Sequence, residues 1–70
     1  MDILSERMKQ LRTEANINQE DLAKDLGLSL SAYRRYEWGA REPGASTVRA
    51  LASYFHVSAD YLLGLSDDRK

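Results

Sequence analysis

Apolar residues recur with a helical period along almost the whole chain. Leu4, Met8, Leu11 and Ala15 fall within an arc of about 60° when each residue is turned by 100° from the one before it. This narrow stripe predicts a helix over residues 3–15 that packs against a core on one side only. Helical spacing of apolar residues returns in later segments, so we expect an all-α fold.

Capping residues and glycines divide the next part of the chain into two short helices. Asn18 can accept hydrogen bonds from the free amides of a new helix, and Gly27 can adopt the left-handed conformation that ends one. The helix between them carries Leu22, Ala23 and Leu26. Ser29 is the cap of a third helix over Leu30–Trp38, which Gly39 ends.

The second half of the chain predicts two more helices. The segment Ala40–Gly44 contains proline and favours a connection. A fourth helix over Ala45–His56 carries an apolar stripe of Val48, Leu51, Ala52 and Phe55. Ser58 caps a last short helix with Tyr61, Leu62 and Leu63, which Gly64 closes. Residues 1–65 therefore form one domain, and the polar residues 66–70 are either a frayed tail or part of a linker.

Length and composition exclude several classes of protein. A chain of 70 residues forms one modest core without a deep substrate pocket, which argues against an enzyme. Its apolar stretches are too short to span a bilayer, and its first residues lack the basic start and apolar core of a signal peptide. The absence of cysteine suits a reducing cytoplasm. We therefore expect a cytoplasmic protein with no membrane partner.

The chain also lacks the signatures of metal or cofactor chemistry. His56 is the only histidine, and without cysteine it cannot supply the three or four ligands of a zinc site. No nucleophile elbow, zinc-protease motif or phosphate-binding glycine run occurs. We expect no catalytic residue, no metal, no cofactor and no small-molecule ligand in this domain.

Charge is unevenly distributed, although the total is −1. Residues 29–50 contain four arginines and two glutamates, which is a local net charge of +2, and the segments on either side are acidic. Composition alone leaves two interpretations open. The basic segment is either an ordinary solvated surface or a surface for an acidic partner.

The second and third predicted helices have the spacing of a helix-turn-helix. About three residues that include Gly27 separate them, and in this motif the second helix enters the major groove of DNA. Ala23 lies where the two helices approach closely, and Leu28, Tyr33 and Tyr36 can anchor the second helix. An ordinary helical hairpin with a glycine cap is the alternative.

A helical wheel of residues 30–38 separates a core face from an exposed face. If Ser29, Tyr33 and Tyr36 face the core, four residues lie together on the opposite side: Ser31, Arg34, Arg35 and Trp38. The planar fork of arginine fits O6 and N7 of guanine or grips phosphate, and serine can donate or accept at a base edge. Trp38 has three open interpretations, which are stacking on DNA, covering the fourth helix and filling a subunit contact.

Four segments carry a family resemblance: Asn18–Ser29, Tyr33–Gly39, Arg41–Pro43 and Val57–Gly64. Together they resemble the lambda-repressor-like, Cro/cI-type helix-turn-helix (XRE) family over nearly the whole chain. The resemblance implies a compact five-helix domain with its helix-turn-helix at helices 2 and 3. It also implies a sequence-specific double-stranded DNA-binding transcriptional regulator of a bacterium or phage, most often a repressor at an operator.

The resemblance further implies roles for individual residues. Gln19 matches a glutamine that contacts a DNA phosphate and often braces the start of the third helix. Arg35 matches a frequent base-reading or phosphate-contacting arginine and is the first candidate for recognition. Three other positions face the groove: Ser29, Ser31 and Arg34. Arg12 and Glu37 match a partly buried ion pair that ties the first helix to the third.

Several positions depart from the family pattern. Leu30 stands where many relatives have a glutamine for adenine, so apolar contact with a thymine methyl replaces that readout. Trp38 replaces a more usual polar residue, and Gly44 replaces a more usual helix cap. Gly44 and Ala45 are small, so the amides that open the fourth helix can approach a phosphate closely. Arg41 in the preceding loop adds one backbone contact.

The expected partners follow from the size of a recognition helix. A single helix reads only about four base pairs, so we expect a homodimer on two half-sites roughly 34 Å apart, or multiples of that spacing. Tyr54 and Leu63 lie off the main stripes of their helices and are either dimer-face residues or ordinary exposed residues. The alternative function is a protein–protein interaction module of a regulatory complex, which the total charge of −1 and Leu30 favour.

Overall fold

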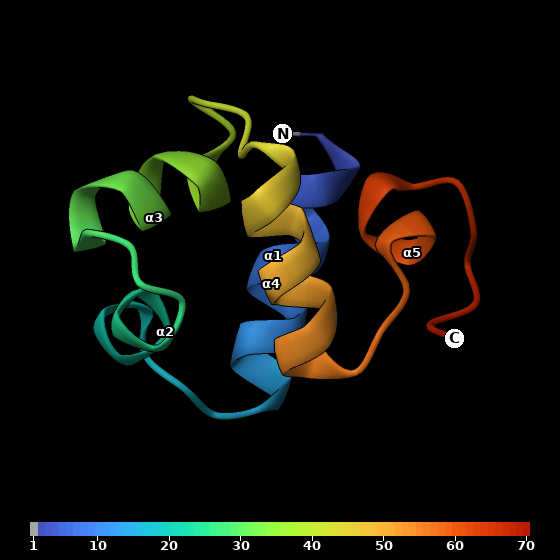
Figure 1. Ribbon diagram of the computed structural model, residues 1–70, viewed down its shortest axis with the longest axis horizontal. Coiled ribbons are helices and arrows are strands. Elements are labelled where there is room, and N and C mark those ends of the chain that lie inside the picture. Colours follow the sequence, from blue (N-terminus) through green and yellow to red (C-terminus); the bar gives the residue numbers. More distant parts are fainter. Residues whose placement is uncertain (1) are drawn as a thin grey trace.

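The computed structural model describes residues 2–70, which form five α-helices and no strand (Figure 1). The helices are α1 (Ile3–Glu14), α2 (Gln19–Asp25), α3 (Leu30–Trp38), α4 (Ala45–Phe55) and α5 (Ala59–Leu63). The prediction of an all-α fold is confirmed. Every helix in this part of the chain is too short or too polar to cross a membrane.

The helices are arranged around α1. This helix packs against α3 and α5, while α2 packs against α3 and α4 packs against α5. In Figure 1, α2 and α3 lie on one side of the molecule and α5 lies on the other. The longest extent of the molecule is 28 Å. The helix-turn-helix and the last helix are thus at opposite ends.

Each helix contributes one fully buried side chain to the core. These residues are Met8, Leu22, Tyr33, Leu51 and Leu62, each with 0% exposure. Five more hydrophobic residues are buried around them: Leu4, Leu11, Ala23, Val48 and Tyr61. Because the core draws on all five helices, no helix is an optional addition to the fold.

The helix-turn-helix follows the predicted local signals. The Asn18 side chain accepts a hydrogen bond of 2.7 Å from the Asp21 amide, which caps α2. Gly27 has a φ of 73°, and beyond it the Leu28 amide donates to the Ala23 carbonyl at 2.8 Å. Ala23 itself is 1% exposed, as expected where two helices approach closely. Glycine is therefore required at this turn for its backbone conformation.

Three details of the sequence prediction are wrong. Ala15 does not continue the buried stripe, because α1 ends at Glu14 and Ala15 is an exposed C-cap. Ser29 does not face the core, because it is an exposed N-cap whose hydroxyl oxygen accepts a hydrogen bond of 3.1 Å from the Ala32 amide. His56 lies outside α4, because its left-handed conformation, with a φ of 56°, ends that helix at Phe55.

Residues 66–70 lie against the domain and are not a free tail. Arg7 donates to the Ser66 carbonyl at 2.7 Å and to the Asp67 carboxylate at 2.9 Å. Arg69 donates two hydrogen bonds, of 2.8 and 2.9 Å, to the carboxylate of Glu14. The polar composition of this segment predicted fraying, but its charges meet opposite charges on α1, some sixty residues earlier in the chain.

Candidate nucleic-acid interface

The outer face of α3 brings five of the predicted site residues together. Leu30, Ser31, Arg34, Arg35 and Trp38 line one surface hollow of about 490 Å³. Leu30 is half-buried, and the other four are exposed. The buried Tyr33 and the half-buried Tyr36 hold the opposite face of the helix against the core. The predicted exposed face, Ser31 with the two arginines and Trp38, is therefore confirmed.

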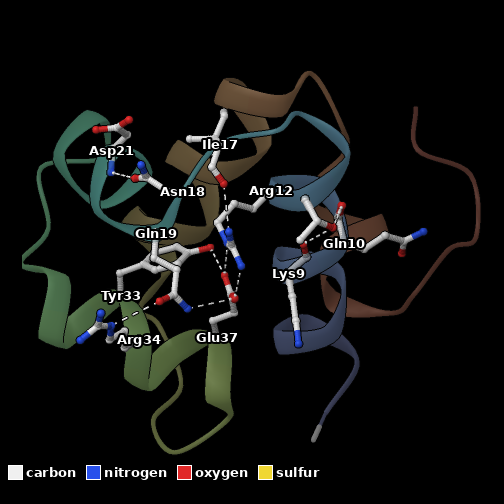
Figure 2. Close-up of polar contacts among 11 residues, drawn as sticks. Lys9, Gln10, Arg12, Ile17, Asn18, Gln19, Asp21, Tyr33, Arg34 and Glu37 are labelled. Carbon is white, nitrogen blue, oxygen red and sulfur yellow. Dashed lines mark hydrogen bonds and ion pairs between the residues drawn. The ribbon is translucent and has the colours of Figure 1, made fainter.

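A buried ion pair fixes α3 to α1 behind this face. Arg12 Nε lies 2.8 Å from Glu37 Oε2, and Arg12 Nη2 lies 2.9 Å from Glu37 Oε1 (Figure 2). The side chains of Arg12 and Glu37 are 14% and 2% exposed. A third guanidinium nitrogen, Nη1, donates to the Ile17 carbonyl at 2.9 Å. The arginine thus joins α1, the α1–α2 loop and α3.

Two more donors reach the Glu37 carboxylate. The Tyr33 hydroxyl donates to Oε2, and Gln19 Nε2 donates to Oε1 at 3.2 Å. Burial by itself raises the pKa of Glu37, but the hydrogen bonds from Arg12, Tyr33 and Gln19 outweigh it, so the pKa lies below its usual value. Burial and the adjacent carboxylate raise the pKa of Tyr33. Glu37 is therefore an anion and Tyr33 a neutral donor at neutral pH.

Gln19 connects this buried network to the exposed face of α3. Its Oε1 accepts a hydrogen bond of 3.2 Å from Arg34 Nε while its Nε2 faces Glu37 (Figure 2). The amide can satisfy an anion and a cation together only in this orientation. The family resemblance implied that Gln19 braces the start of α3. The structure places its contacts on the middle and end of that helix.

Trp38 lies at the edge between two hollows. It is 62% exposed, so most of its surface is available to DNA or to another subunit. Besides the hollow on α3, it borders a second one of about 440 Å³ that Lys9, Asn18 and Gln19 also line. Lys9 was missed by the sequence analysis. Its position three residues before Arg12, one turn of α1 away, was the signal that could have found it.

The loop after α3 brings the remaining predicted residues beside this face. The amides of Ala40 and Arg41 donate to the Arg35 carbonyl at 2.9 and 3.2 Å, which holds the loop to the end of α3. Arg41, Gly44 and Ala45 are all exposed. Gly44 is the N-cap of α4 and supplies no side-chain hydrogen bond to it. The Thr47 and Val48 amides donate to the Gly44 carbonyl at 3.1 Å, and the start of α4 has no side-chain cap.

The two residues considered for a dimer face have different surroundings. Tyr54 is half-buried, its hydroxyl donates to Asp25 Oδ2 at 2.8 Å, and its ring packs edge-on against Phe55 with 5.0 Å between centroids. This tyrosine connects α4 to α2. Leu63, in contrast, is 49% exposed at the far end of the molecule.

The comparisons with known proteins agree with this geometry. A family model described as helix-turn-helix matches residues 8–62. The HTH-type transcriptional regulator YobD of Bacillus subtilis is 38% identical over 63 residues, which are 90% of this chain and 56% of YobD. The cryptic phage CTXphi transcriptional repressor RstR of Vibrio cholerae is 32% identical over 65 residues, which are 93% of this chain and 59% of RstR.

Among solved structures, the chain is similar to the P22 c2 repressor protein in complex with a synthetic operator. The TM-score is 0.82 and the identity is 32%, over 90% of this chain and 96% of the other. The chain spans a little over half the length of the curated relatives YobD, YqaE and YonR, between 53% and 56%. The resemblance found in the sequence is confirmed, and the chain belongs to the XRE-type helix-turn-helix family.

Proposed function

We propose that this protein is a sequence-specific double-stranded DNA-binding transcriptional regulator that acts as a repressor by occupying an operator in the cytoplasm. The observation that carries the proposal is the placement of Arg34 and Arg35 side by side on an exposed helix face that the core holds rigidly. A rigid helix with two arginines suits the major groove, where the donor and acceptor pattern of each base pair is distinct. The similarity to the operator-bound c2 repressor supports the same assignment.

The proposed contacts divide into base reading and backbone positioning. The residues that read bases are Leu30, Ser31, Arg34 and Arg35, which share the hollow on α3. The residues that contact the DNA backbone are Gln19, Ser29, Trp38, Arg41, Gly44 and Ala45, which surround that hollow on α2, at both ends of α3 and in the following loop. Lys9 joins the second group through its position beside Trp38.

Useful specificity requires two copies of the domain. One α3 helix reads about four base pairs, so we propose a homodimer on two half-sites separated by roughly 34 Å. This requirement concerns the DNA-bound state.

The experiment that tests this function is selection of bound duplexes from a randomised DNA pool, followed by titration of the selected duplex. Arg34→Ala and Arg35→Ala should each remove about 1–3 kcal/mol of discrimination between the selected and a scrambled duplex. Both side chains are exposed, so melting should change little. Lys70→Ala is the matched control, because it removes one positive charge from the exposed C-terminus, on the side of the molecule away from α3 (Figure 1).

Salt dependence separates DNA binding from the alternative of a protein-interaction module. The logarithm of the DNA affinity should fall with the logarithm of salt by about 0.9 for each contacted phosphate. If the pool yields no enriched sequence and binding has no such slope, the proposed function is wrong and the protein-interaction module becomes the better assignment.

A further inference from the structure

Asp25 occupies a position that the physics of a single helix disfavours. It is the last residue of α2, where the negative end of the helix dipole repels a carboxylate. Asp21 lies four residues earlier on the same side of α2, so a second negative charge is close to it. Aspartate is in addition a weak helix former. A residue that breaks several local rules at one position points to a contact outside its own helix.

The contact outside α2 is the hydrogen bond to Tyr54 on α4. The Tyr54 hydroxyl donates to Asp25 Oδ2 at 2.8 Å, while the half-buried ring packs against Phe55 and the core. The hydrogen bond to Asp25 raises the pKa of Tyr54, so the hydroxyl stays protonated and can donate at neutral pH. Among the side-chain hydrogen bonds and ion pairs within residues 2–70, this one alone joins the helix-turn-helix to α4 or α5.

This hydrogen bond attaches the far end of α4 to the helix-turn-helix. At its start, α4 is joined to α3 by the loop of residues 39–44, which two backbone hydrogen bonds to the Arg35 carbonyl hold in place (Figure 1). At its end, Tyr54 joins α4 to the last residue of α2. The helix has 11 residues, so about 16 Å separate the two attachments. A second attachment this far from the loop opposes rotation of α2 and α3 relative to α4 more effectively than the loop alone.

The angle between the helix-turn-helix and α4 matters for the proposed function. The proposed base contacts come from α3, whereas Gly44 and Ala45 at the start of α4 belong to the proposed contacts with the DNA backbone. The bases and phosphates of a duplex have fixed relative positions, so both sets of contacts form together only at one angle. If that angle varies in the free protein, binding also costs the entropy of selecting it.

We propose that Tyr54 and Asp25 are positioning residues, whose hydrogen bond fixes the helix-turn-helix relative to α4 so that base and backbone contacts form together. The proposal rests on the proposed function and deepens it, because it names two residues that support specificity through other groups. Neither residue lines the hollow on α3. The tertiary hydrogen bond also explains why α2 ends in a residue that its own helix disfavours.

The experiment measures discrimination, which is the ratio of the affinities for a short duplex with one selected half-site and for a scrambled duplex. A single half-site makes the result independent of any contact between copies. Tyr54→Phe removes the hydroxyl and keeps the ring on Phe55, and Asp25→Ala removes the acceptor. Each change should reduce the ratio about three- to tenfold, which corresponds to the loss of one hydrogen bond. Tyr54→Phe should leave the affinity for the scrambled duplex unchanged, because that affinity depends on phosphate charges.

Asp25→Asn is the matched control for the loss of charge. It removes the same negative charge as Asp25→Ala, but its amide oxygen can still accept from the Tyr54 hydroxyl, so discrimination should stay close to that of the unaltered chain. In the Asp25→Ala chain, the further change Tyr54→Phe should have almost no effect, because the two residues act through one contact. Residues that only stabilise the fold would lower the melting temperature and leave the ratio of affinities unchanged.

Residual dipolar couplings of the free chain give a second readout that requires no DNA. One alignment tensor should describe α2, α3 and α4 in the unaltered chain and in Asp25→Asn, whereas in Tyr54→Phe the helix-turn-helix should require a tensor of its own. The proposal is overturned if Tyr54→Phe discriminates as well as the unaltered chain, or if one tensor still describes all three helices in that variant. The absence of any selected sequence would instead refute the proposed function, and the couplings would still decide whether the hydrogen bond fixes the angle.

Discussion

Replacing Arg12 with methionine tests whether the ion pair behind α3 holds the fold together. The change removes two hydrogen bonds, of 2.8 and 2.9 Å, from a carboxylate that is 2% exposed, and it keeps most of the aliphatic stem. Within residues 2–70, Glu37 then keeps Tyr33 and Gln19 as hydrogen-bond donors and loses its ion pair. Breaking a buried pair on one side costs about 3–5 kcal/mol, since a charge is left buried without compensation.

That loss is large compared with the stability expected of so small a domain. At about 0.05–0.15 kcal/mol per residue, 70 residues correspond to a free energy of unfolding of about 4–10 kcal/mol. Arg12→Met should therefore remove at least about a third of the stability, and at the upper end of the range it removes all of it. The measurement is urea unfolding followed by circular dichroism at neutral pH, with the free energy extrapolated to water.

Two controls decide whether burial is the cause. The pair between Arg69 and Glu14 has the same bidentate geometry, at 2.8 and 2.9 Å, but it lies on the surface. Arg69→Met should therefore lower the free energy of unfolding by only a small fraction of the amount that Arg12→Met does. The double variant Arg12→Met/Glu37→Met should cost clearly less than the sum of the single changes, because it leaves no unpaired charge. If Arg12→Met costs no more than Arg69→Met, the reasoning is refuted.

Three further predictions concern acid, glycine and DNA. The pKa of Glu37 is lower in the folded than in the unfolded protein, so its ionisation stabilises the fold fully above the unfolded pKa of about 4.3. This stabilisation is lost as the pH falls below that value. Glu37→Gln should therefore weaken the decrease in the free energy of unfolding at acid pH. Gly27→Ala should cost about 1–2 kcal/mol in thermal unfolding, for left-handed strain alone, and Gly64→Ala should cost more, since its new Cβ would lie 3.0 Å from Ile3. Lys9→Ala should weaken DNA binding equally for all sequences and reduce the salt slope by about 1; a sequence-dependent loss would contradict its backbone role.

The elements of this fold could be predicted because their limits are set locally. The caps Asn18, Ser29 and Ser58 each accept a hydrogen bond from an amide three residues later, so a short stretch of sequence contains both partners. Gly39 and Gly64 have positive φ values directly after their helices. Such signals do not depend on which helix packs against which.

Two of the incorrect details, Ala15 and the last five residues, depend on how distant segments pack. Ala15 fits the stripe of α1 in every local respect, but no helix covers it where the chain turns towards α2. The last five residues look disordered by composition, whereas Arg7 and Glu14 on α1 bind them. A local pattern contains no information about which charge, nearly sixty residues away, completes a pair.

In the candidate site too, local features could be predicted and contacts between distant residues could not. The exposed face of α3 could be read from its period, but the link between Gln19 and Arg34 spans fifteen residues and depends on how α2 crosses α3. For this reason the wheel treated Arg34 and Arg35 as equivalent, and the resemblance favoured Arg35. The structure distinguishes them, because a contact to the buried network exists for Arg34.

This distinction changes what each arginine can offer to DNA. The Nε atom of Arg34 is already engaged by Gln19, and Gln19 is oriented in turn by the buried carboxylate of Glu37. The terminal nitrogens Nη1 and Nη2 form the fork that matches O6 and N7 of guanine, and they make no hydrogen bond to residues 2–70. The Arg34 side chain thus loses part of its rotamer entropy on folding, and DNA binding costs correspondingly less entropy. We therefore propose that the buried ion pair supports the fold directly and supports recognition through Gln19, with Arg34 ahead of Arg35 as the candidate for a fixed base contact.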